Sequence, residues 1–423
     1  MYEITVGRGT EDAKKYGTMG TAYIGKHVVG VGEDAHTTSK ILLDLVRPHV
    51  MLICGKRGSG KSYSAGVIAE EMAALPEELR KNLAMIIVDP MGIYWSMKNP
   101  NEKDADLLRK WELKPKGIDI TLFIPSGKAA DFDSAGILWD QTITLPVGEV
   151  LTEDWAITFN IDTFSETGIL LGRVINSLKS EKGDSYDIKD ITARIDSDGR
   201  AEQKYKDMLK GLFETVDSWG IFGKEKMLLE EMLKPGAISV VDISHYEGWK
   251  IKNLFVSLVA KKIYQARLIA RKEEETESIT GEEKNKIPMV WLALDEAHQF
   301  LPNDAKTTSS DALLNLVKLG REPGISTLFI TQQPYKLHPD ALSQTDVVIS
   351  HRLTSEQDVK ALETVMQTYL LDSIQKSLDE LPKWKGTAIV LDDNSEKLYS
   401  MVVRPRTSWH AGGSPVAIKE QKT

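Results

Sequence analysis

The chain has 423 residues, of which 41% are hydrophobic and 27% are charged, as is ordinary for a folded globular protein. This length allows two or three domains, or one large core that carries insertions. The formal net charge of −9 argues against a uniformly basic coat for nucleic acid but is compatible with a local basic path. Because the sequence has neither a long apolar run nor a secretory signal, we expect a cytoplasmic protein without a membrane span. Cys54 is the only cysteine, so no disulfide can form within the chain.

The N-terminal region has the pattern of short strands. Apolar stretches between glycines predict strands at residues 21–25, 27–31 and 39–45. Such a short region cannot bury a core of its own. We therefore expect residues 1–47 to form a small β region that packs on the rest of the chain.

From residue 50 onward, apolar runs alternate with helical patterns. The predicted core strands are 50–53, 83–89, 118–124, 237–243, 288–295, 325–331, 347–350 and 386–391, the last of which we expect to be the final element of the sheet. Strands that alternate with helices at this spacing predict an α/β fold whose mostly parallel sheet is covered on both faces.

The segment 151–232 breaks this alternation because its pattern is largely helical. Helices are predicted at 168–179 and 201–219, and we interpret the segment as an insertion carried by the core. A long helix is predicted at 249–272, after the sheet resumes.

Two further segments show no core pattern. The strongly charged run 271–286 has one large apolar residue, Ile279, and is interpreted as a solvated, mobile linker. The tail beyond Arg404 is predicted to be short and partly disordered. The expected organisation is a β region at 1–47, a first core part at 48–150, the insertion at 151–232, a second core part at 233–403 and a tail at 404–423.

A complete phosphate-binding loop lies between the first core strand and the helix that follows it. Residues 54–62 read Cys-Gly-Lys-Arg-Gly-Ser-Gly-Lys-Ser. The glycines let backbone N–H groups converge on phosphate oxygens at the positive end of the helix. Lys61 is predicted to reach the β- and γ-phosphates of ATP, and the Ser62 hydroxyl to bind Mg²⁺. The predicted nucleotide-binding residues are Gly55, Lys56, Arg57, Gly58, Ser59, Gly60, Lys61, Ser62 and Tyr63.

Two carboxylates end a later apolar strand. Asp295 is predicted to complete the Mg²⁺ site, and Glu296 to polarise the attacking water. Gln332 ends the next strand along the chain, where a side-chain amide can contact the γ-phosphate or the water. A strand followed by an acidic helix start is the alternative interpretation of the acids, and a polar turn that of Gln332.

Two arginines are candidates for stabilising the charge of the transition state. Arg321 lies in a turn fixed by glycine and proline, directly ahead of the strand that ends in Gln332. Arg352 follows the strand predicted at 347–350. Either guanidinium is predicted to act in cis or across a subunit boundary, and for either the alternative is a surface ion pair.

Two other nucleotide-dependent families share part of this pattern. Residues 295–298 spell the Asp-Glu-Ala-His box of a large helicase superfamily, but that superfamily adds a Ser-Ala-Thr-like motif and a second motor domain, neither of which is visible. We therefore expect His298 to be a surface or packing residue. A GTPase is disfavoured because the guanine-specifying Asn-Lys-x-Asp string is absent.

Several motifs occur in the order found in one translocase family. They are His49-Val50, Asp89-Pro90-Met91-Gly92, the run 233–242 that ends in Val240-Val241-Asp242, Asp295-Glu296-Ala297-His298, Gly320-Arg321, Thr331-Gln332-Gln333-Pro334 and Arg404-Pro405-Arg406. Over about residues 20–410 the chain resembles the HerA branch of the FtsK–HerA superfamily.

This resemblance implies a RecA-like P-loop motor that assembles as a homo-hexameric ring, with ATP at subunit boundaries and double-stranded DNA in the pore. It also implies a nuclease partner, in DNA end processing or in antiphage defence. Three features depart from the family. The N-terminal β-barrel is reduced, Ile93 stands where a glutamate is expected, and Glu322 replaces a basic residue.

Two functions follow from the sequence. The first is a Mg²⁺-dependent ATPase that drives a DNA translocase or helicase ring. The second is an ATP-dependent scaffold whose nucleotide state controls a partner effector protein.

Overall fold

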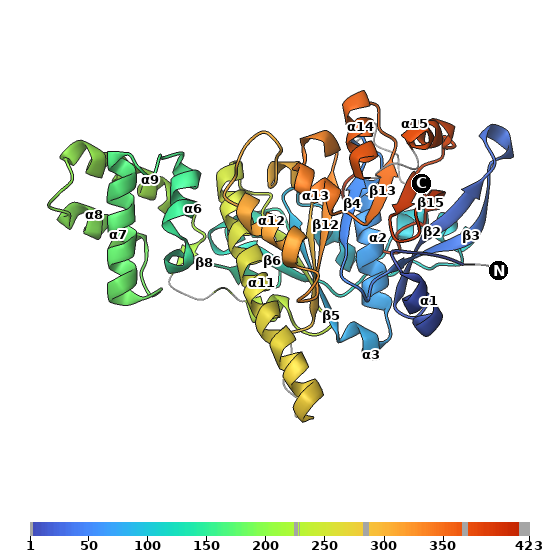
Figure 1. Ribbon diagram of the computed structural model, residues 1–423, viewed down its shortest axis with the longest axis horizontal. Helices are drawn as coiled ribbons and strands as arrows, with labels where there is room; N and C mark the ends of the chain where they lie inside the picture. Colours follow the sequence, from blue (N-terminus) through green and yellow to red (C-terminus); the bar gives the residue numbers. More distant parts are fainter. Residues whose placement is uncertain (1–2, 224–226, 228, 282–286, 366–370, 414–423) are drawn as a thin grey trace.

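In a computed structural model, which describes residues 3–223, 227, 229–281, 287–365 and 371–413, one large sheet runs through the molecule. In spatial order its 13 described strands are β1 (Ile4–Val6), β3 (His36–Asp44), β2 (Thr21–Val29), β15 (Lys397–Val403), β14 (Thr387–Asp392), β13 (Val347–His351), β4 (Val50–Cys54), β12 (Ile325–Thr331), β11 (Met289–Leu294), β5 (Leu83–Asp89), β10 (Ile238–Asp242), β6 (Thr121–Pro125) and β7 (Gln141–Ile143). Figure 1 shows the sheet at the centre, with helices on both faces.

The remaining elements connect and cover these strands. The α-helices are α1 (Thr10–Tyr16), α2 (Lys61–Ala74), α3 (Glu77–Arg80), α4 (Ala105–Lys110), α5 (Ala129–Ser134), α6 (Thr152–Phe159), α7 (Glu166–Lys182), α8 (Ile188–Ser197), α9 (Gln203–Asp217), α10 (Leu229–Met232), α11 (Trp249–Thr280), α12 (Ser310–Leu319), α13 (Pro339–Ser343), α14 (Glu356–Val365) and α15 (Leu371–Glu380). The 3-10 helices are η1 (Gly32–Asp34), η2 (Tyr94–Lys98), η3 (Glu102–Asp104), η4 (Ser126–Lys128), η5 (Val147–Glu149), η6 (Ala297–Gln299) and η7 (Pro334–Lys336). A separate two-stranded sheet pairs β8 (Leu145–Pro146) with β9 (Phe222–Gly223).

The predicted α/β fold with a mostly parallel sheet is confirmed. All neighbouring strands from β13 to β7 are parallel, whereas β14, β15 and β2 form an antiparallel extension beyond β13. Parallel strands need crossover connections, and these put helices on both faces of the sheet.

Alternation along the buried strands divides the apolar side chains between two cores. In β4, Val50 and Leu52 belong to the core shared with α11 and α12, whereas Met51 and Ile53 belong to the core shared with α2. Successive side chains of a strand point to opposite faces, so a strand covered on both faces is apolar throughout. This double burial fixes the position of the loop that follows β4.

The segment between β8 and β10 is largely helical in its described part. Helices α7, α8 and α9 lie at one end of the molecule, beyond α6 (green in Figure 1). Trp155 on α6 stacks on Phe159, with 5.4 Å between ring centroids, and packs edge-on against Phe213 of α9 at 5.1 Å. Lys261 of α11 forms an ion pair with Asp154 at 2.8 Å, which attaches this segment to the core.

The N-terminal region differs from a reduced barrel. Strands β1, β3 and β2 continue the central sheet, because β2 pairs with β15 in antiparallel register. The stretches predicted as separate strands at 21–25 and 27–31 are joined in the single strand β2, which ends at Val29 and has irregular pairing at Tyr23/Gly25 and Lys26/Val28. The expectation that this region packs on the rest of the chain is confirmed.

The prediction of a mobile linker at 271–286 was wrong for residues 271–280, which continue helix α11. Arg271 forms ion pairs with Glu274 and Glu275, three and four residues ahead. Such pairs stabilise a helix whose charged side chains face water. Residues 282–286 of the predicted linker lie outside the described residues.

One expectation about the C-terminal part is also corrected. The strand at 386–391 is not the final sheet element, because β15 follows it and pairs with it in antiparallel register. Of the predicted tail, the structure describes the residues up to 413, and Arg404, Arg406 and Ser408 are buried. Residues 414–423 of the predicted tail lie outside the described residues.

Candidate nucleotide site at the carboxyl edge of the sheet

The loop at residues 55–60 connects the end of β4 to the N-terminus of α2. Gly60 caps this helix in the left-handed region, with φ of +113°, which favours glycine. The Lys56 N–H donates to the carbonyl of Arg352 at 2.9 Å, so the loop is tied to the end of the neighbouring strand β13. The side chains of Lys56 and Arg57 are exposed, whereas Lys61 is buried and donates from Nζ to the carbonyl of Lys56 at 3.2 Å.

A buried histidine, His351, connects helix α2 to strand β14 next to the loop. The carbonyl of Thr387 lies 3.0 Å from His351 Nδ1, and since a carbonyl only accepts, Nδ1 carries the proton. Nε2 of His351 contacts the Ser64 hydroxyl of α2 at 2.8 Å. Burial lowers the pKa of His351 to about 4, so this histidine is neutral near pH 7.

The strand order brings the phosphate loop and the acidic pair together. Strand β12 lies between β4 and β11, and all three strands are parallel, so their following residues meet at one edge of the sheet. The Ser62 hydroxyl donates to Asp295 Oδ2 at 2.8 Å across 233 residues of sequence. The two predicted metal ligands are therefore in direct contact.

Tyr94 is a site residue that the sequence reasoning missed. Its hydroxyl donates to the same oxygen, Asp295 Oδ2, at 3.1 Å. The turn that presents it is organised by Asp89, whose carboxylate accepts four backbone N–H groups, from Met91, Gly92, Ile93 and Tyr94, at 2.7 to 3.1 Å. The Asp-Pro-x-Gly motif was the available signal, because it predicts a turn directly ahead of this tyrosine.

Glu296 is held in the left-handed region, with φ of 51° and ψ of 42°. A non-glycine residue in this region is uncommon and is found where the surroundings fix it. Burial and the neighbouring Asp295 carboxylate raise the pKa of Glu296 to about 7, although Lys61 and Gln332 act to lower it. A carboxyl group with a pKa near neutrality is suited to accept a proton in this pH range.

Gln332 lies beside Glu296, at the tip of the adjacent strand. Its side-chain nitrogen is 3.3 Å from each carboxylate oxygen of Glu296. His298 joins the same two segments, because its Nδ1 contacts the Thr331 hydroxyl at 2.9 Å. His298 is 6% exposed, and burial lowers its pKa to about 4, so it is a neutral packing residue rather than a surface one.

A cavity of about 310 Å³ opens between the loop and the tip of β12. It is lined by Lys56, Arg57, Gln332, Gln333, Tyr335 and residues of the segment that follows β13, which are Leu353, Thr354, Ser355, Gln357 and Asp358. Its size is in the range of sites for small ligands. The edge of the sheet therefore has space beside both the loop and the glutamine.

The donor groups at this edge fit a small, hard cation. Ser62 and Asp295 offer oxygen atoms, which are the ligands that Mg²⁺ prefers, and one or two protein ligands are usual when phosphates supply others. Within the described residues, no group of three or more His, Cys, Asp or Glu side chains is arranged to hold a metal by itself.

The two candidate arginines are not brought into this site. Arg321 precedes β12 and lies at the opposite, amino edge of the sheet, where it donates to the carbonyl of Gln344 at 2.9 Å and lies 3.6 Å from Asp346. Its side chain is 48% exposed. Arg352 lies next to the loop through its backbone, but its side chain donates to the carbonyl of Leu381.

Comparison with models of known protein families identifies the family of this chain. A model described as the central domain of the helicase HerA matches residues 22–263, and a model of the HerA-like C-terminal region matches residues 254–395. The chain belongs to the HerA helicase family. The expectation drawn from its motifs is confirmed.

Two curated relatives and one solved structure are similar to this chain. It is 26% identical over 390 residues to the DNA double-strand break repair helicase HerA of Pyrococcus furiosus, covering 82% of this chain and 63% of that one. It is 24% identical over 330 residues to a probable helicase of the same description from Methanocaldococcus jannaschii, covering 72% and 62%. The chain thus spans less than two thirds of the length of these relatives. VirB4 of Thermoanaerobacter pseudethanolicus has the same fold, with a TM-score of 0.53 over 90% of this chain and 97% of that one, at 13% identity.

In the described part of this HerA family member, no helix combines the length and the apolar character that crossing a bilayer requires.

Proposed function

We propose that this protein is a Mg²⁺-dependent ATPase that drives a double-stranded DNA translocase or helicase. The observation that carries the proposal is the meeting of the phosphate loop with the acidic pair, through the hydrogen bond between Ser62 and Asp295 and the contact of Gln332 with Glu296. Family membership and the curated DNA repair helicases agree with it.

The chemistry divides among residues from separate elements. The backbone N–H groups of residues 55–63 would hold the phosphates of ATP, and Lys61 would neutralise charge on the transferring group. Ser62 and Asp295 would hold Mg²⁺, and the positive charge of the ion would stabilise the negative charge that develops on the phosphates. Glu296 would accept a proton from the attacking water, and Gln332 would orient that water.

A ring of identical subunits is part of the proposal. Arg321 lies at the edge of the sheet opposite its own phosphate loop and is half exposed, so it can stabilise a transition state only at the site of another copy. A homo-hexamer with ATP at subunit boundaries satisfies this geometry. Arg352 remains a second candidate in cis, provided that its side chain leaves the carbonyl of Leu381.

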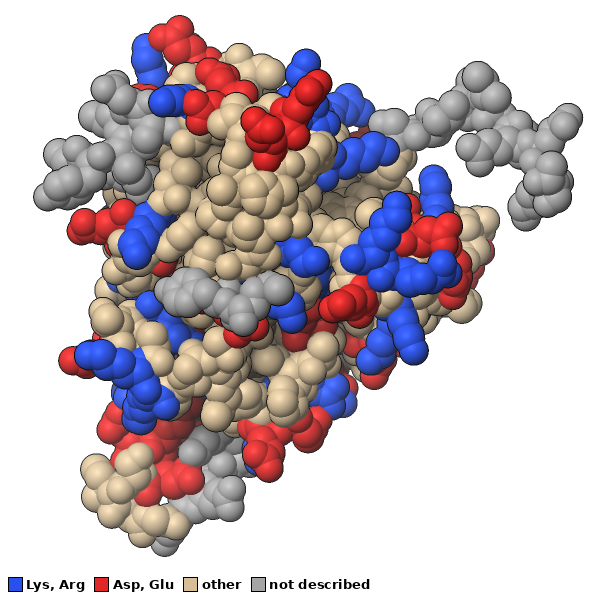
Figure 2. Space-filling view, turned by 90° about the vertical axis from the view of Figure 1, so that its right-hand side faces the viewer, with Lys and Arg blue, Asp and Glu red and all other residues tan. Residues whose placement is uncertain are grey.

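The DNA contacts are proposed to be local. On the face seen in Figure 2, basic and acidic side chains alternate, and no broad area of one sign appears. This agrees with the net charge of −9 and favours a narrow path, such as a pore lining, over a basic outer surface.

The proposal also covers the cellular pathway and the roles of the separate parts of the chain. We propose action in the cytoplasm with a nuclease partner, in DNA end processing or in antiphage defence. Residues 48–150 and 233–403 would form the motor core, with residues 1–47 and the insertion at 151–232 available to partners.

The test is the ATPase rate of the purified full chain with and without linear double-stranded DNA, together with the mass of the particle. We expect a six-subunit mass and a DNA-stimulated rate that falls steeply as salt rises, because phosphate contacts release counterions. Hydrolysis that DNA leaves unchanged, with or without a co-purified partner, would favour an ATP-dependent scaffold instead.

The rate of hydrolysis should depend on pH through Glu296. Only the ionised carboxylate accepts a proton, and with a pKa of about 7 its ionised fraction falls about tenfold between pH 8 and pH 6. We therefore expect kcat/KM for ATP to fall by about the same factor over this interval. A profile that is flat from pH 8 to pH 6 would contradict the assignment of Glu296 as the base.

A further inference from the structure

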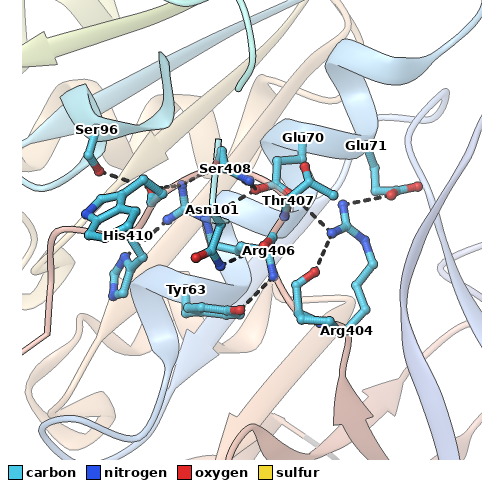
Figure 3. A network of polar contacts seen from close by, with 12 residues as sticks. Tyr63, Glu70, Glu71, Ser96, Asn101, Arg404, Arg406, Thr407, Ser408 and His410 are labelled. Carbon is cyan, nitrogen blue, oxygen red and sulfur yellow. Dashed lines mark hydrogen bonds and ion pairs between the residues drawn. The ribbon is translucent and has the colours of Figure 1, made fainter. Parts of the chain in front are cut away.

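The chain after β15 forms an ordered strap, defined here as residues 404–411, that lies between the phosphate-loop helix and the segment after β5 (Figure 3). The strap lies beyond the residues that the two family models match, which end at residue 395. Its buried arginines are not explained by the roles proposed above.

On one side the strap binds α2 through hydrogen bonds and ion pairs with Glu70. Oε2 of this carboxylate accepts from Arg404 Nη1 at 2.8 Å and from the Thr407 N–H at 3.0 Å. Its Oε1 accepts from Arg406 Nε at 3.3 Å and from both the N–H and the hydroxyl of Ser408, at 2.9 and 2.6 Å. Although burial acts to raise it, the two arginines hold the pKa of Glu70 below its usual value, so the carboxylate is ionised near pH 7.

Arg406 packs along the face of α2 that leads toward the phosphate loop. Tyr63, Gly66 and Glu70 are spaced by three and four residues and share this face. The Arg406 N–H donates to the Tyr63 hydroxyl at 2.6 Å, and Tyr63 is the residue after Ser62. The Arg406 guanidinium has no exposed surface and lies 5.8 Å from the centre of the Tyr63 ring.

Gly66 makes this close approach possible. A Cβ atom at position 66 would lie 2.6 Å from Arg406 Cζ and 2.7 Å from Nη1, which is closer than side chains tolerate. Glycine in the middle of a helix is otherwise unfavourable. Its presence here is therefore explained by the guanidinium that occupies the space.

On its other side the strap binds the segment that follows β5. Asn101 donates from its side chain to the Arg406 carbonyl at 3.0 Å and from its backbone to the Thr407 carbonyl at 2.8 Å. The Ser96 hydroxyl donates to the carbonyl of Trp409 at 3.1 Å. Ser96 belongs to η2, the element that presents Tyr94.

The two elements that the strap contacts, α2 and η2, meet at the Asp295 carboxylate. The hydroxyls of Ser62, from α2, and of Tyr94, from η2, both donate to Asp295 Oδ2. The strap holds these two elements against each other. We propose that the strap is a positioning element of the hydrolysis site, in which Arg406 aligns Ser62 and Tyr94 on the metal-binding carboxylate of Asp295. This inference rests on the proposed ATPase function.

The sharpest test is Gly66→Ala, because it displaces Arg406 without removing any hydrogen-bonding group. The matched control is Gly211→Ala in α9, where an added Cβ meets no atom within 4 Å. The full chain is assayed for ATP hydrolysis at a temperature at which circular dichroism shows each variant to be folded. The Mg²⁺ concentration for half-maximal rate is measured as well.

We expect Gly66→Ala to raise the Mg²⁺ requirement or to lower kcat/KM for ATP by about tenfold or more, as is typical for residues that orient a metal ligand. Gly211→Ala should leave both quantities unchanged and the unfolding temperature equal or higher. A purely structural strap would lower the unfolding temperature of Gly66→Ala and leave the kinetics of the folded protein within about twofold of the parent, which would overturn the proposal.

A double variant adds an independent check, should Gly66→Ala fold poorly. Arg406→Ala removes the atoms that an alanine at position 66 would meet. We therefore expect Arg406→Ala to reproduce the kinetic loss, and Gly66→Ala to cause little additional loss in the Arg406→Ala background. Independent, multiplicative losses would overturn the proposal. If the parent chain itself bound and hydrolysed no ATP, the proposed function would fail first, and that result is distinguishable from a failure of the strap alone.

Discussion

Replacing Glu296 with glutamine should reduce the rate of ATP hydrolysis by about 10²- to 10⁴-fold, the usual contribution of a general base. The amide keeps the size of the side chain but cannot accept a proton from water. Because Lys61 and the loop are unchanged, the protein should still bind nucleotide. Phosphate release measures hydrolysis, and titration with a fluorescent ATP analogue measures binding.

Glu78→Gln provides the matched control, because it makes the same chemical change at an exposed carboxylate on α3. It should leave hydrolysis within about twofold of the parent, as is usual for surface substitutions away from a site. If Glu296→Gln hydrolysed ATP at the parent rate, Glu296 would not be the base.

Replacing Lys61 with alanine should impair both binding and hydrolysis. A charge-assisted hydrogen bond contributes about 1.5–3 kcal/mol, so we expect nucleotide affinity to fall roughly 10- to 100-fold. Loss of a preorganised positive group should reduce the rate at saturating ATP by a further 10²- to 10³-fold. The same phosphate-release and fluorescence titrations measure both effects.

Lys81→Ala, at an exposed lysine after α3, is the control for loss of a lysine side chain. It should change neither quantity. A Lys61→Ala protein that is folded and binds the ATP analogue as tightly as the parent would contradict the placement of phosphates on this loop.

The features that sequence predicts well are local ones. The glycine pattern of residues 55–60, the apolar runs of β4 and β11, and the acids that end β11 each lie within a few residues of one another. Their meeting at one edge also follows from sequence, because parallel strands place their following residues together. The amino-edge position of Arg321 was available by the same rule, since this residue precedes its strand.

Contacts between distant segments were not predictable in this way. Arg406 and Glu70 are 336 residues apart. An arginine in a polar tail does not by itself predict an ion pair with a buried carboxylate on a distant helix. Tyr94 reaches Asp295 only because Asp89 folds the intervening turn. Strand β15 was missed because its outer half is polar and partly exposed, so its pattern lacks the continuous apolar run of the central strands.

The continuous sheet has a consequence for assemblies. The β2–β3 hairpin extends one end of the sheet, and helices α7–α9 lie beyond the other end, with the candidate nucleotide site between them (Figure 1). Two macromolecules docked at these two ends would not compete for the same surface. A molecule docked at the β2–β3 end would be linked to the candidate nucleotide site through the paired strands β2, β15, β14, β13 and β4, whereas one docked at α7–α9 would be linked to it through the packing of the helical segment on the core.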